Sequence, residues 1–306
     1  MRAFVTGATG FLGAALVHRL VGAGVPVAIL RRSTSSDWRL HQLPGSVIQI
    51  QGDLANPVGF KDTLATFRPD TCFHMAWHGV ASRHRNDLSQ AYANVESTLR
   101  LVELAADVGC QTWIGAGSQA EYGPQEGAIN EDAPTRPTTL YGAAKLATYH
   151  LAGRAVELLG MRFAWLRVFS TYGPGDNPEW MIPSLIRALL ARERPELTEG
   201  RQRWDYLFVR DAAEAFAAVA STPEARGLYN LGSGEAIPLR EIVALVRDQI
   251  DPALPLGFGA IPYRPDQVMW LQADCRRLKQ ATNWAPLFSL SEGLRETIAW
   301  HKSVAK

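Results

Sequence analysis

Short apolar runs alternate with longer segments of helical periodicity through the first two thirds of the chain. The apolar runs are of strand length and lie near 2–6, 26–30, 47–50, 71–75, 111–116 and 162–168. The helical segments lie near 11–23, 57–66, 87–108, 140–159 and 179–191. This alternation predicts an α/β fold, a doubly wound parallel sheet with helices on both faces. A Pro/Gly-rich break, YGPGDNP at 172–178, follows the last of these strands, and the pattern beyond it is irregular.

The first predicted strand runs into a glycine-rich turn. Gly7, Gly10 and Gly13 lie in GATGFLG, between that strand and the first predicted helix. The order strand, glycine turn, helix is typical of dinucleotide sites, where backbone N–H groups at a helix N-terminus approach a pyrophosphate. The spacing G-x-x-G-x-x-G differs from the common G-x-G-x-x-G, and the alternative is a glycine turn that binds nothing.

Three further residues carry the candidate chemistry. Tyr141 and Lys145 lie four residues apart in a predicted helix, so their side chains project from one face. A nearby ammonium stabilises a phenolate, which lets a tyrosine exchange a proton at neutral pH. Ser118, in GSQAEYG at 117–123, follows a different predicted strand and supplies a hydroxyl that can hold a substrate oxygen. Together these groups suit reduction of a carbonyl or oxidation of an alcohol.

The chain resembles an extended short-chain dehydrogenase/reductase of the subgroup that acts on nucleotide-activated sugars. The resemblance rests on TGATGFLG, Asp53–Leu54, FHMAW (73–77), Asn94, SQAEYG (118–123), YGAAK (141–145), FSTYGP (169–174), WDYLFVRD (204–211), RPD (264–266) and NWAP (283–286). It implies a Rossmann-type domain at 1–171 plus 204–231, and a smaller nucleotide-sugar-binding domain at 172–203 plus 232–306. It also implies a homodimer through the helices 87–108 and 140–159, whose apolar and alanine-rich patterns leave a second face to bury.

The resemblance implies a role for particular residues. Ser118, Tyr141 and Lys145 are the expected catalytic residues. The expected cofactor-binding residues are Gly7, Gly10, Phe11, Leu12, Gly13, Arg31, Arg32, Asp53, Leu54, Ala76, Tyr141 and Lys145. The expected substrate-binding residues are Trp77, Gln119, Ser170, Arg203 and Arg264. Arg83 and Arg85 either line the sugar or phosphate site or are solvated, and Trp180 and Trp204 either stack on the ligand or pack in the core.

The end of the second predicted strand favours NADP(H) over NAD(H). NAD enzymes of this fold usually carry an acidic residue there, which accepts hydrogen bonds from the ribose hydroxyls. In this chain the strand is followed by Arg31 and Arg32, and no carboxylate stands at that point. An arginine attracts a 2′-phosphate and an aspartate repels it. The alternative is a solvated arginine pair.

The segment after Ser118 separates the reactions of this subgroup. Related 4,6-dehydratases carry an acid and a base there, and this chain has Gln119 and Ala120, neither of which exchanges protons usefully at neutral pH. Glu121 comes one residue later, and strand alternation predicts that it faces away, as a surface or structural carboxylate. Two reactions remain: NADPH-dependent reduction of a keto group, at C4 of a deoxyhexose, and 4-epimerisation with bound NAD(P). A cofactor-binding regulatory protein of the same fold is a third possibility.

Composition sets outer limits on function. The chain has 306 residues and a net charge of +1, so no global field draws it to nucleic acid or to a membrane surface. Its three cysteines are widely spaced and indicate reduced core thiols. His74 and His78 flank a strand end, where their spacing does not bring the side chains together, so no metal site is expected. No signal pattern or membrane-length apolar run is found, and the expected location is the cytoplasm.

Overall fold

A seven-stranded parallel sheet forms the centre of the molecule. The structure, a computed structural model, describes residues 1–41 and 43–304. The strand order is β12-β7-β5-β4-β1-β2-β3, and every pairing in this sheet is parallel. The strands are β1 (Ala3–Thr6), β2 (Val27–Arg31), β3 (Ile48–Gln51), β4 (Thr71–His74), β5 (Thr112–Ser118), β7 (Arg162–Val168) and β12 (Gly227–Leu231). The predicted α/β class is therefore confirmed.

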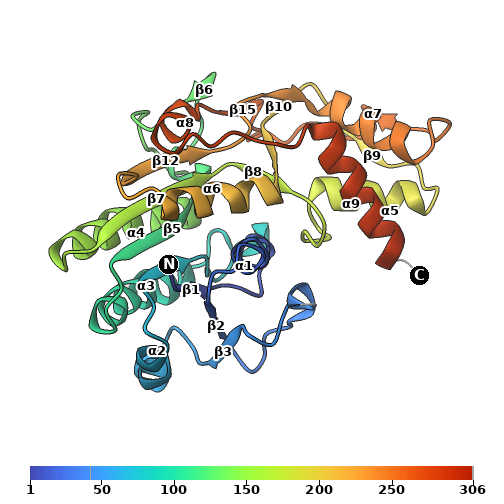
Figure 1. The fold of residues 1–306 in the computed structure, drawn as a ribbon. Coiled ribbons are helices and arrows are strands. Elements are labelled where there is room, and N and C mark those ends of the chain that lie inside the picture. The colour runs from blue at the N-terminus through green and yellow to red at the C-terminus, as the bar shows by residue number, and fades with distance from the viewer. Residues whose placement is uncertain (42, 305–306) are drawn as a thin grey trace.

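Helices cover both faces of this sheet (Figure 1). On one face α1 (Phe11–Gly22) packs against α6 (Val209–Ser221), and on the other α3 (Ser89–Asp107) packs against α4 (Leu140–Leu158). Two buried apolar clusters fill the space between the helices and the sheet, one on each side. The helix expected at 57–66 starts as a 3-10 turn, η2 (Pro57–Phe60), and becomes the α-helix α2 (Lys61–Phe67).

The strand β5 extends two residues beyond its predicted end. Ala116, Gly117 and Ser118 continue the parallel ladder with Leu166, Arg167 and Val168 of β7. This extension matters because it carries Ser118 to the carboxyl edge of the sheet. A 3-10 turn, η4 (Gln119–Glu121), follows at once and ends the strand.

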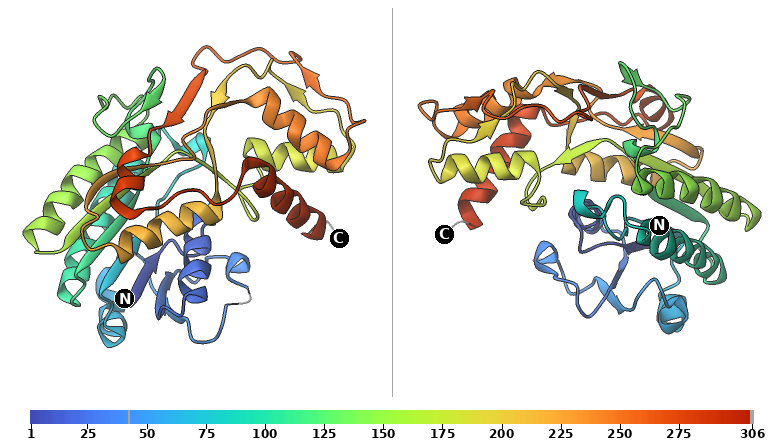
Figure 2. Two further views of the ribbon diagram at one scale, coloured as in Figure 1. Left: turned by 45° about the horizontal axis from the view of Figure 1, so that its top comes forward. Right: turned by 180° about the vertical axis from the view of Figure 1, so that it is seen from behind.

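The remaining elements form a second group beside the sheet. Its helices are α5 (Met181–Leu190), α7 (Leu239–Ile250), α8 (Arg276–Thr282) and α9 (Leu290–Val304). A four-stranded sheet has the order β13-β10-β15-β6, made by Ile237–Pro238, Arg203–Trp204, Trp270–Ala273 and Ala128–Ile129. Two strand pairs complete it: β8 (Ser170–Tyr172) with β11 (Tyr206–Phe208), and β9 (Glu196–Leu197) with β14 (Gly257–Phe258). A separate apolar cluster joins α5, α7 and α9, and both views of Figure 2 show these helices apart from the strands β1–β3.

A large cleft opens at the carboxyl ends of the parallel strands. Residues from the turn after β1, from the segment after β4 and from the end of β5 line one side, and residues from 168–182, 202–206 and 264–267 line the other. The strand order reverses between β1 and β4, and ligands of open α/β sheets bind outside the strand ends at that switch point. The fold thus places the cleft where open α/β sheets bind their ligands.

Candidate active site

The glycine turn after β1 is shaped for close approach of a ligand. Gly7 has a φ of +68°, and a Cβ there would lie 2.5 Å from the Ala76 nitrogen, so a larger residue does not fit. A Cβ on Gly13 would collide with the Gly7 carbonyl oxygen. Gly10 caps α1 without any side-chain hydrogen bond to its first N–H groups. These free donors and the missing side chains fit the pyrophosphate of a dinucleotide.

The two arginines at the end of β2 point to different places. Arg32 is exposed and lines the cleft together with Ser35, Asp53 and Leu54. Arg31 donates from Nη1 to Asp37 Oδ2 at 3.0 Å and to Gln49 Oε1 at 2.8 Å. Within the described part of the chain, Arg31 is absent from the cleft lining. The structure therefore places only Arg32 where the sequence predicts a cofactor contact, because successive residues at a strand end face opposite sides.

Arg39 ties the cofactor side of the cleft to the opposite side. It follows β2 in the 3-10 turn η1 (Trp38–Leu40), and its guanidinium donates to the Gly175 carbonyl at 2.8 Å and to the Thr9 carbonyl at 3.2 Å. Thr9 belongs to the glycine turn, and Gly175 belongs to the loop after β8. Asp176 follows Gly175 in the same loop, and burial raises the pKa of the Asp176 carboxyl to about 7. Sequence reasoning missed this bridge, because the signal is a lone arginine in an irregular segment.

Ser118, Tyr141 and Lys145 come together in the cleft. Each of the three side chains is at most 8% exposed, and all line the cleft. Tyr141 and Lys145 project from the start of α4, where Thr139 caps the helix by accepting from the Gly142 N–H at 3.1 Å. Burial raises the pKa of the Tyr141 phenol, and the Ser118 hydroxyl and the Arg85 guanidinium offset part of that rise. The phenol is therefore protonated at neutral pH in this state.

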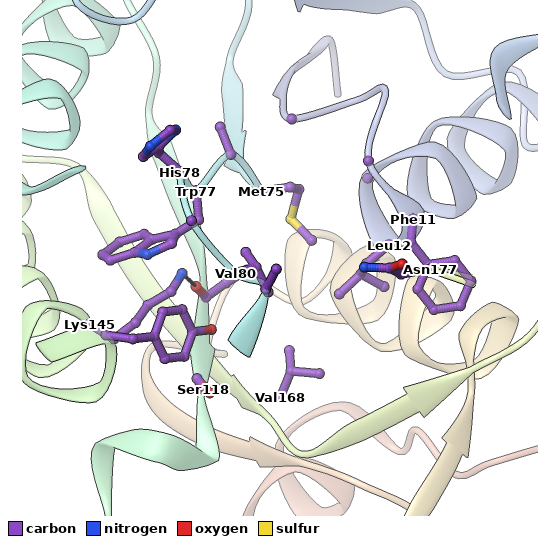
Figure 3. Close-up of a pocket in the computed structure, with 18 of the residues that line it drawn as sticks. Phe11, Leu12, Met75, Trp77, His78, Val80, Ser118, Lys145, Val168 and Asn177 are labelled. Carbon is purple, nitrogen blue, oxygen red and sulfur yellow. Dashed lines mark hydrogen bonds between the residues drawn. The ribbon is translucent and has the colours of Figure 1, made fainter. Parts of the chain in front are cut away.

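The Lys145 ammonium is held at two points. Its Nζ donates to the Ala116 carbonyl at 2.6 Å and lies 3.7 Å from the centroid of the Trp77 ring. Burial lowers the pKa of Lys145 to about 7, and the negative charge of Glu121 opposes that effect. Figure 3 shows Trp77, Lys145 and Ser118 on one side of the pocket, with Phe11, Leu12 and Asn177 across from them.

A buried ion pair between Glu121 and Arg167 lies next to Ser118 and holds its backbone. Glu121 is fully buried, and its two oxygens accept from the Ser118 N–H at 2.8 Å, Trp165 Nε1 at 3.0 Å and Arg167 Nε at 2.6 Å. Glu121 is thus the structural carboxylate that the sequence allowed, although it lies in the turn η4 and not on a strand. The Ser-x-x-Glu spacing of 118–121 is a capping-box signal, and it was the available clue.

Four of the five predicted substrate-binding residues line the cleft: Trp77, Gln119, Ser170 and Arg264. Arg203 does not appear in that lining among the described residues. Its Nε donates to the Ala236 carbonyl at 3.2 Å, and its guanidinium lies over the Trp270 ring. Gln202 and Trp204, the residues on either side, do line the cleft. Neighbouring side chains on a strand face opposite ways, which explains why Trp204 of β10 lines the cleft and Arg203 does not.

Arg85 is the cation of the segment after β4 that enters the cleft. Its guanidinium lies 5.4 Å from the Tyr141 ring centroid and 5.9 Å from the Trp180 ring centroid. Its Nε is buried and has no hydrogen-bond partner among the described residues. Arg83, two residues earlier, is exposed and pairs with Glu179 at 3.1 Å. A half-buried guanidinium with a free donor suits an anionic or oxygen-rich ligand.

The histidines near the cleft are accounted for by other contacts. His74 is buried, and its ring nitrogens lie 2.9 Å from Thr6 Oγ1 and 3.0 Å from Thr98 Oγ1. Burial lowers the pKa of His74 to about 3, so the ring is neutral. Across residues 1–41 and 43–304, no three His, Cys, Asp or Glu side chains gather as a metal would require. Over the same residues, no helix is both long and apolar enough to span a membrane.

Proteins of known sequence are similar to this chain over most of their length. UDP-glucose 4-epimerase of Azospirillum brasilense is 27% identical over 99% of this chain and 92% of that protein. dTDP-glucose 4,6-dehydratase of Streptomyces griseus is 27% identical over 97% of this chain and 95% of its own.

Solved structures show the same fold. MoeE5, in complex with UDP-glucuronic acid and NAD, superimposes with a TM-score of 0.85 at 29% identity, covering 99% of this chain and all of that one. The UDP-glucose 4-epimerase of Thermus thermophilus, in complex with NAD, gives a TM-score of 0.86 at 26% identity, covering 99% of each chain.

The family model for the NAD dependent epimerase/dehydratase family matches residues 3–232. That range includes the glycine turn, Ser118, Tyr141 and Lys145, the residues that form the site described above. The chain therefore belongs to the NAD dependent epimerase/dehydratase family, whose members are extended short-chain dehydrogenase/reductase enzymes of nucleotide sugars.

Proposed function

We propose that the protein uses NADPH to reduce a keto group, at C4, of a nucleotide-activated deoxyhexose. The observation that carries the proposal is the segment Ser118–Glu121. Ser118 reaches the cleft beside Tyr141, while Gln119 and Ala120 supply no acid or base and Glu121 is committed to Arg167. Loss of water from a sugar needs such an acid and base, and hydride transfer to a carbonyl needs only a proton donor.

The chain's own residues divide the work of this reaction. A bound NADPH supplies the hydride. Tyr141 donates the proton to the nascent alkoxide, a role that suits a phenol whose pKa burial raises. Ser118 steadies the carbonyl oxygen while charge develops on it. Lys145 stabilises the phenolate that remains and hydrogen-bonds the cofactor ribose.

The preference for NADP(H) rests on Arg32 in the cleft lining and on the ion pair that Arg31 forms with Asp37. Asp37 is paired with Arg31 at 3.0 Å, so its charge is neutralised locally. An unpaired acid at this point would repel a 2′-phosphate, and Arg32 attracts one. Residues 1–171 plus 204–231 hold the cofactor in this proposal, and 172–203 plus 232–306 hold the nucleotide sugar.

The substrate side of the cleft suits a diphosphate joined to flat and apolar groups. Arg264 lines it with an exposed side chain, paired only loosely with Asp266 at 3.9 Å. Arg85 supplies a second cation nearer to Tyr141. Trp180 and Trp204 offer ring faces for a base or a sugar. Arg203, which bonds within the protein, has no part in this assignment.

The second candidate is a 4-epimerase with bound NAD(P), favoured by the likeness to two UDP-glucose 4-epimerases. An epimerase must also remove a proton from the substrate hydroxyl, and the raised pKa of Tyr141 favours the donor role instead. A regulatory protein that binds the cofactor without turnover is a third possibility.

One experiment separates these functions. The protein is mixed with NADPH and a nucleotide-linked 4-keto-6-deoxyhexose, and separately with UDP-glucose and NAD. Stoichiometric loss of NADPH with formation of the alcohol supports the reductase. Interconversion of UDP-glucose and UDP-galactose without net cofactor change supports the epimerase. Cofactor binding without either reaction points to the regulatory protein.

A further inference from the structure

The sequence predicts a substrate contact for Trp77, yet its indole lies against the catalytic residues. The ring centroid is 3.7 Å from Lys145 Nζ, and the ring meets the Tyr141 ring edge-on at 6.1 Å and 86°. The indole Nε1 donates to Gln90 Oε1 at 2.8 Å, which fixes the orientation of the ring. Gln90 is itself fully buried and bonded to the carbonyls of Gly79 and His84.

We infer that Trp77 is a positioning residue: its ring face holds the Lys145 ammonium beside Tyr141 through a cation–π contact. Tryptophan gives the strongest contact of this kind, and removal from water strengthens it. Lys145 is only 4% exposed. Its one hydrogen bond in the described residues goes to the Ala116 carbonyl, and the Trp77 ring face, at 3.7 Å, is a second attractive group in contact with the ammonium.

Two effects of the indole on Lys145 oppose each other. The ring excludes water, which disfavours the charged amine. The negative face of the ring attracts the same charge. An aliphatic side chain of similar reach would exclude water without providing that attraction. Comparing tryptophan with leucine at position 77 therefore isolates the cation–π contribution.

The other titratable groups around Lys145 are uncharged or bonded to other partners, so they do not replace the attraction of the indole. His74, from β4, is neutral because burial lowers its pKa to about 3. Glu121, from η4, attracts the ammonium, but its oxygens are held by Arg167 and two N–H groups. Tyr141 is protonated and uncharged, and the Arg85 guanidinium lies on the Tyr141 ring. A second indole, Trp165, lies 5.7 Å from Lys145 Nζ.

The consequence for catalysis rests on the proposed function, whereas the contact itself does not. Because burial brings the pKa of Lys145 to about 7, a modest change in that pKa decides whether the ammonium is charged at the working pH. Loss of the indole should lower the pKa further and leave a neutral amine beside Tyr141. The alkaline limb of turnover would then move to lower pH.

The test measures the pKa of Lys145 directly. The chain has five lysines, so NMR titration of protein labelled at lysine Cε gives a resolvable set of signals, and Lys145→Arg assigns the relevant one. Trp77→Leu should lower the pKa by about one unit. Trp77→Phe, which keeps a weaker ring face and is a milder change, should lower it by less. Trp270→Leu removes an exposed indole outside the cleft lining of the described residues and should leave the pKa of Lys145 unchanged.

An unchanged or raised pKa of Lys145 in both Trp77 variants overturns the inference, because the indole would then only exclude water from the ammonium. The titration needs no substrate. Failure of the proposed function would instead appear as an absence of NADPH consumption in the wild type. Where turnover is found, the alkaline limb of kcat should move with the pKa in the Trp77 variants and stay in place in Trp270→Leu.

Discussion

Glu121 and Arg167 form an ion pair with an oxygen–nitrogen distance of 2.6 Å next to Ser118, and both side chains are almost completely buried. The two residues lie 46 positions apart, on η4 and β7. The same carboxylate accepts from the Ser118 N–H, so the pair fixes the backbone that presents the Ser118 hydroxyl. A buried carboxylate thus holds the end of the strand on which Ser118 lies.

Breaking this pair should cost much of the protein's stability. Glu121→Ala leaves Arg167 buried without a partner, and such changes typically cost about 3–5 kcal/mol of unfolding free energy. Denaturant unfolding measures the loss. Glu199→Ala is the matched control, because Glu199 pairs with Arg201 at 2.9 Å and both side chains are exposed, outside α3 and α4. That change should cost less than about 1 kcal/mol. Equal losses in the two variants would show that burial of the Glu121 pair is unimportant.

Cofactor selectivity should depend on Arg32 and not on Arg31. The wild type should bind NADPH more tightly than NADH. Arg32→Asp should reduce the ratio of the two dissociation constants by about ten- to a hundredfold, because a charged hydrogen bond contributes about 1.5–3 kcal/mol. Arg31→Gln should change the ratio little, since Arg31 pairs with Asp37. Fluorescence titration gives both constants, and equal affinity for NADPH and NADH in the wild type would refute the preference.

The free energy of unfolding of the cofactor-free protein should depend on pH through the titration of Lys145. Its pKa is about 7 in the folded state, against 10.5 for an ordinary lysine, so the unfolded chain binds an extra proton between those limits. Folding is therefore disfavoured by this group at low pH, and the penalty is relieved as pH rises above 7. Relative to Lys145→Met, the wild type should gain about 3 kcal/mol between pH 7 and pH 9.5.

Chemical unfolding of both proteins at the two pH values measures this difference. A constant gap between wild type and Lys145→Met would mean that Lys145 keeps an ordinary pKa in the fold.

The helices α3 and α4 should form a homodimer interface. On α4, Leu151 is 49% exposed and Leu158 is 69% exposed, which leaves an apolar face to bury. Light scattering at micromolar concentration should give twice the chain mass of 33.6 kDa. Leu151→Glu should shift the mass toward the monomer, and Leu287→Glu, at an exposed position outside both helices, should not. A wild-type monomer would contradict the proposal.

The sequence predicted those parts of the site that local patterns encode. The glycine turn, the i,i+4 pair of Tyr141 and Lys145, and the strand before Ser118 each have a short-range signal, and the structure brings them to one cleft. Helix and strand limits were close for the same reason. The extension of β5 to Ser118 escaped prediction because it depends on pairing with β7, which is distant in sequence.

Arg31 and Arg203, which the structure keeps out of the cleft lining of the described residues, are set apart from their neighbours by which way each side chain faces. Arg31 and Arg32 are neighbours with the same chemistry, and only the contact of Arg31 with Asp37 separates their roles. Trp204 lines the cleft and Arg203 does not, because the pairing of β10 with β13 and β15 fixes the orientation of each residue. The Trp77 contact with Lys145 joins the segment after β4 to α4, and no local sequence pattern predicts it.

Turnover of the Tyr141→Phe variant tests the central claim most directly. Consumption of NADPH is followed with a nucleotide-linked 4-keto-6-deoxyhexose, and NADPH binding is measured in parallel. The wild type should consume NADPH, and loss of the proton donor should lower the rate by about 10²–10⁴-fold while binding stays nearly intact. Tyr149→Phe, on the same helix but outside the cleft lining of the described residues, should keep the wild-type rate. A Tyr141→Phe rate close to that of the wild type would contradict the account, because the proton would then come from another group.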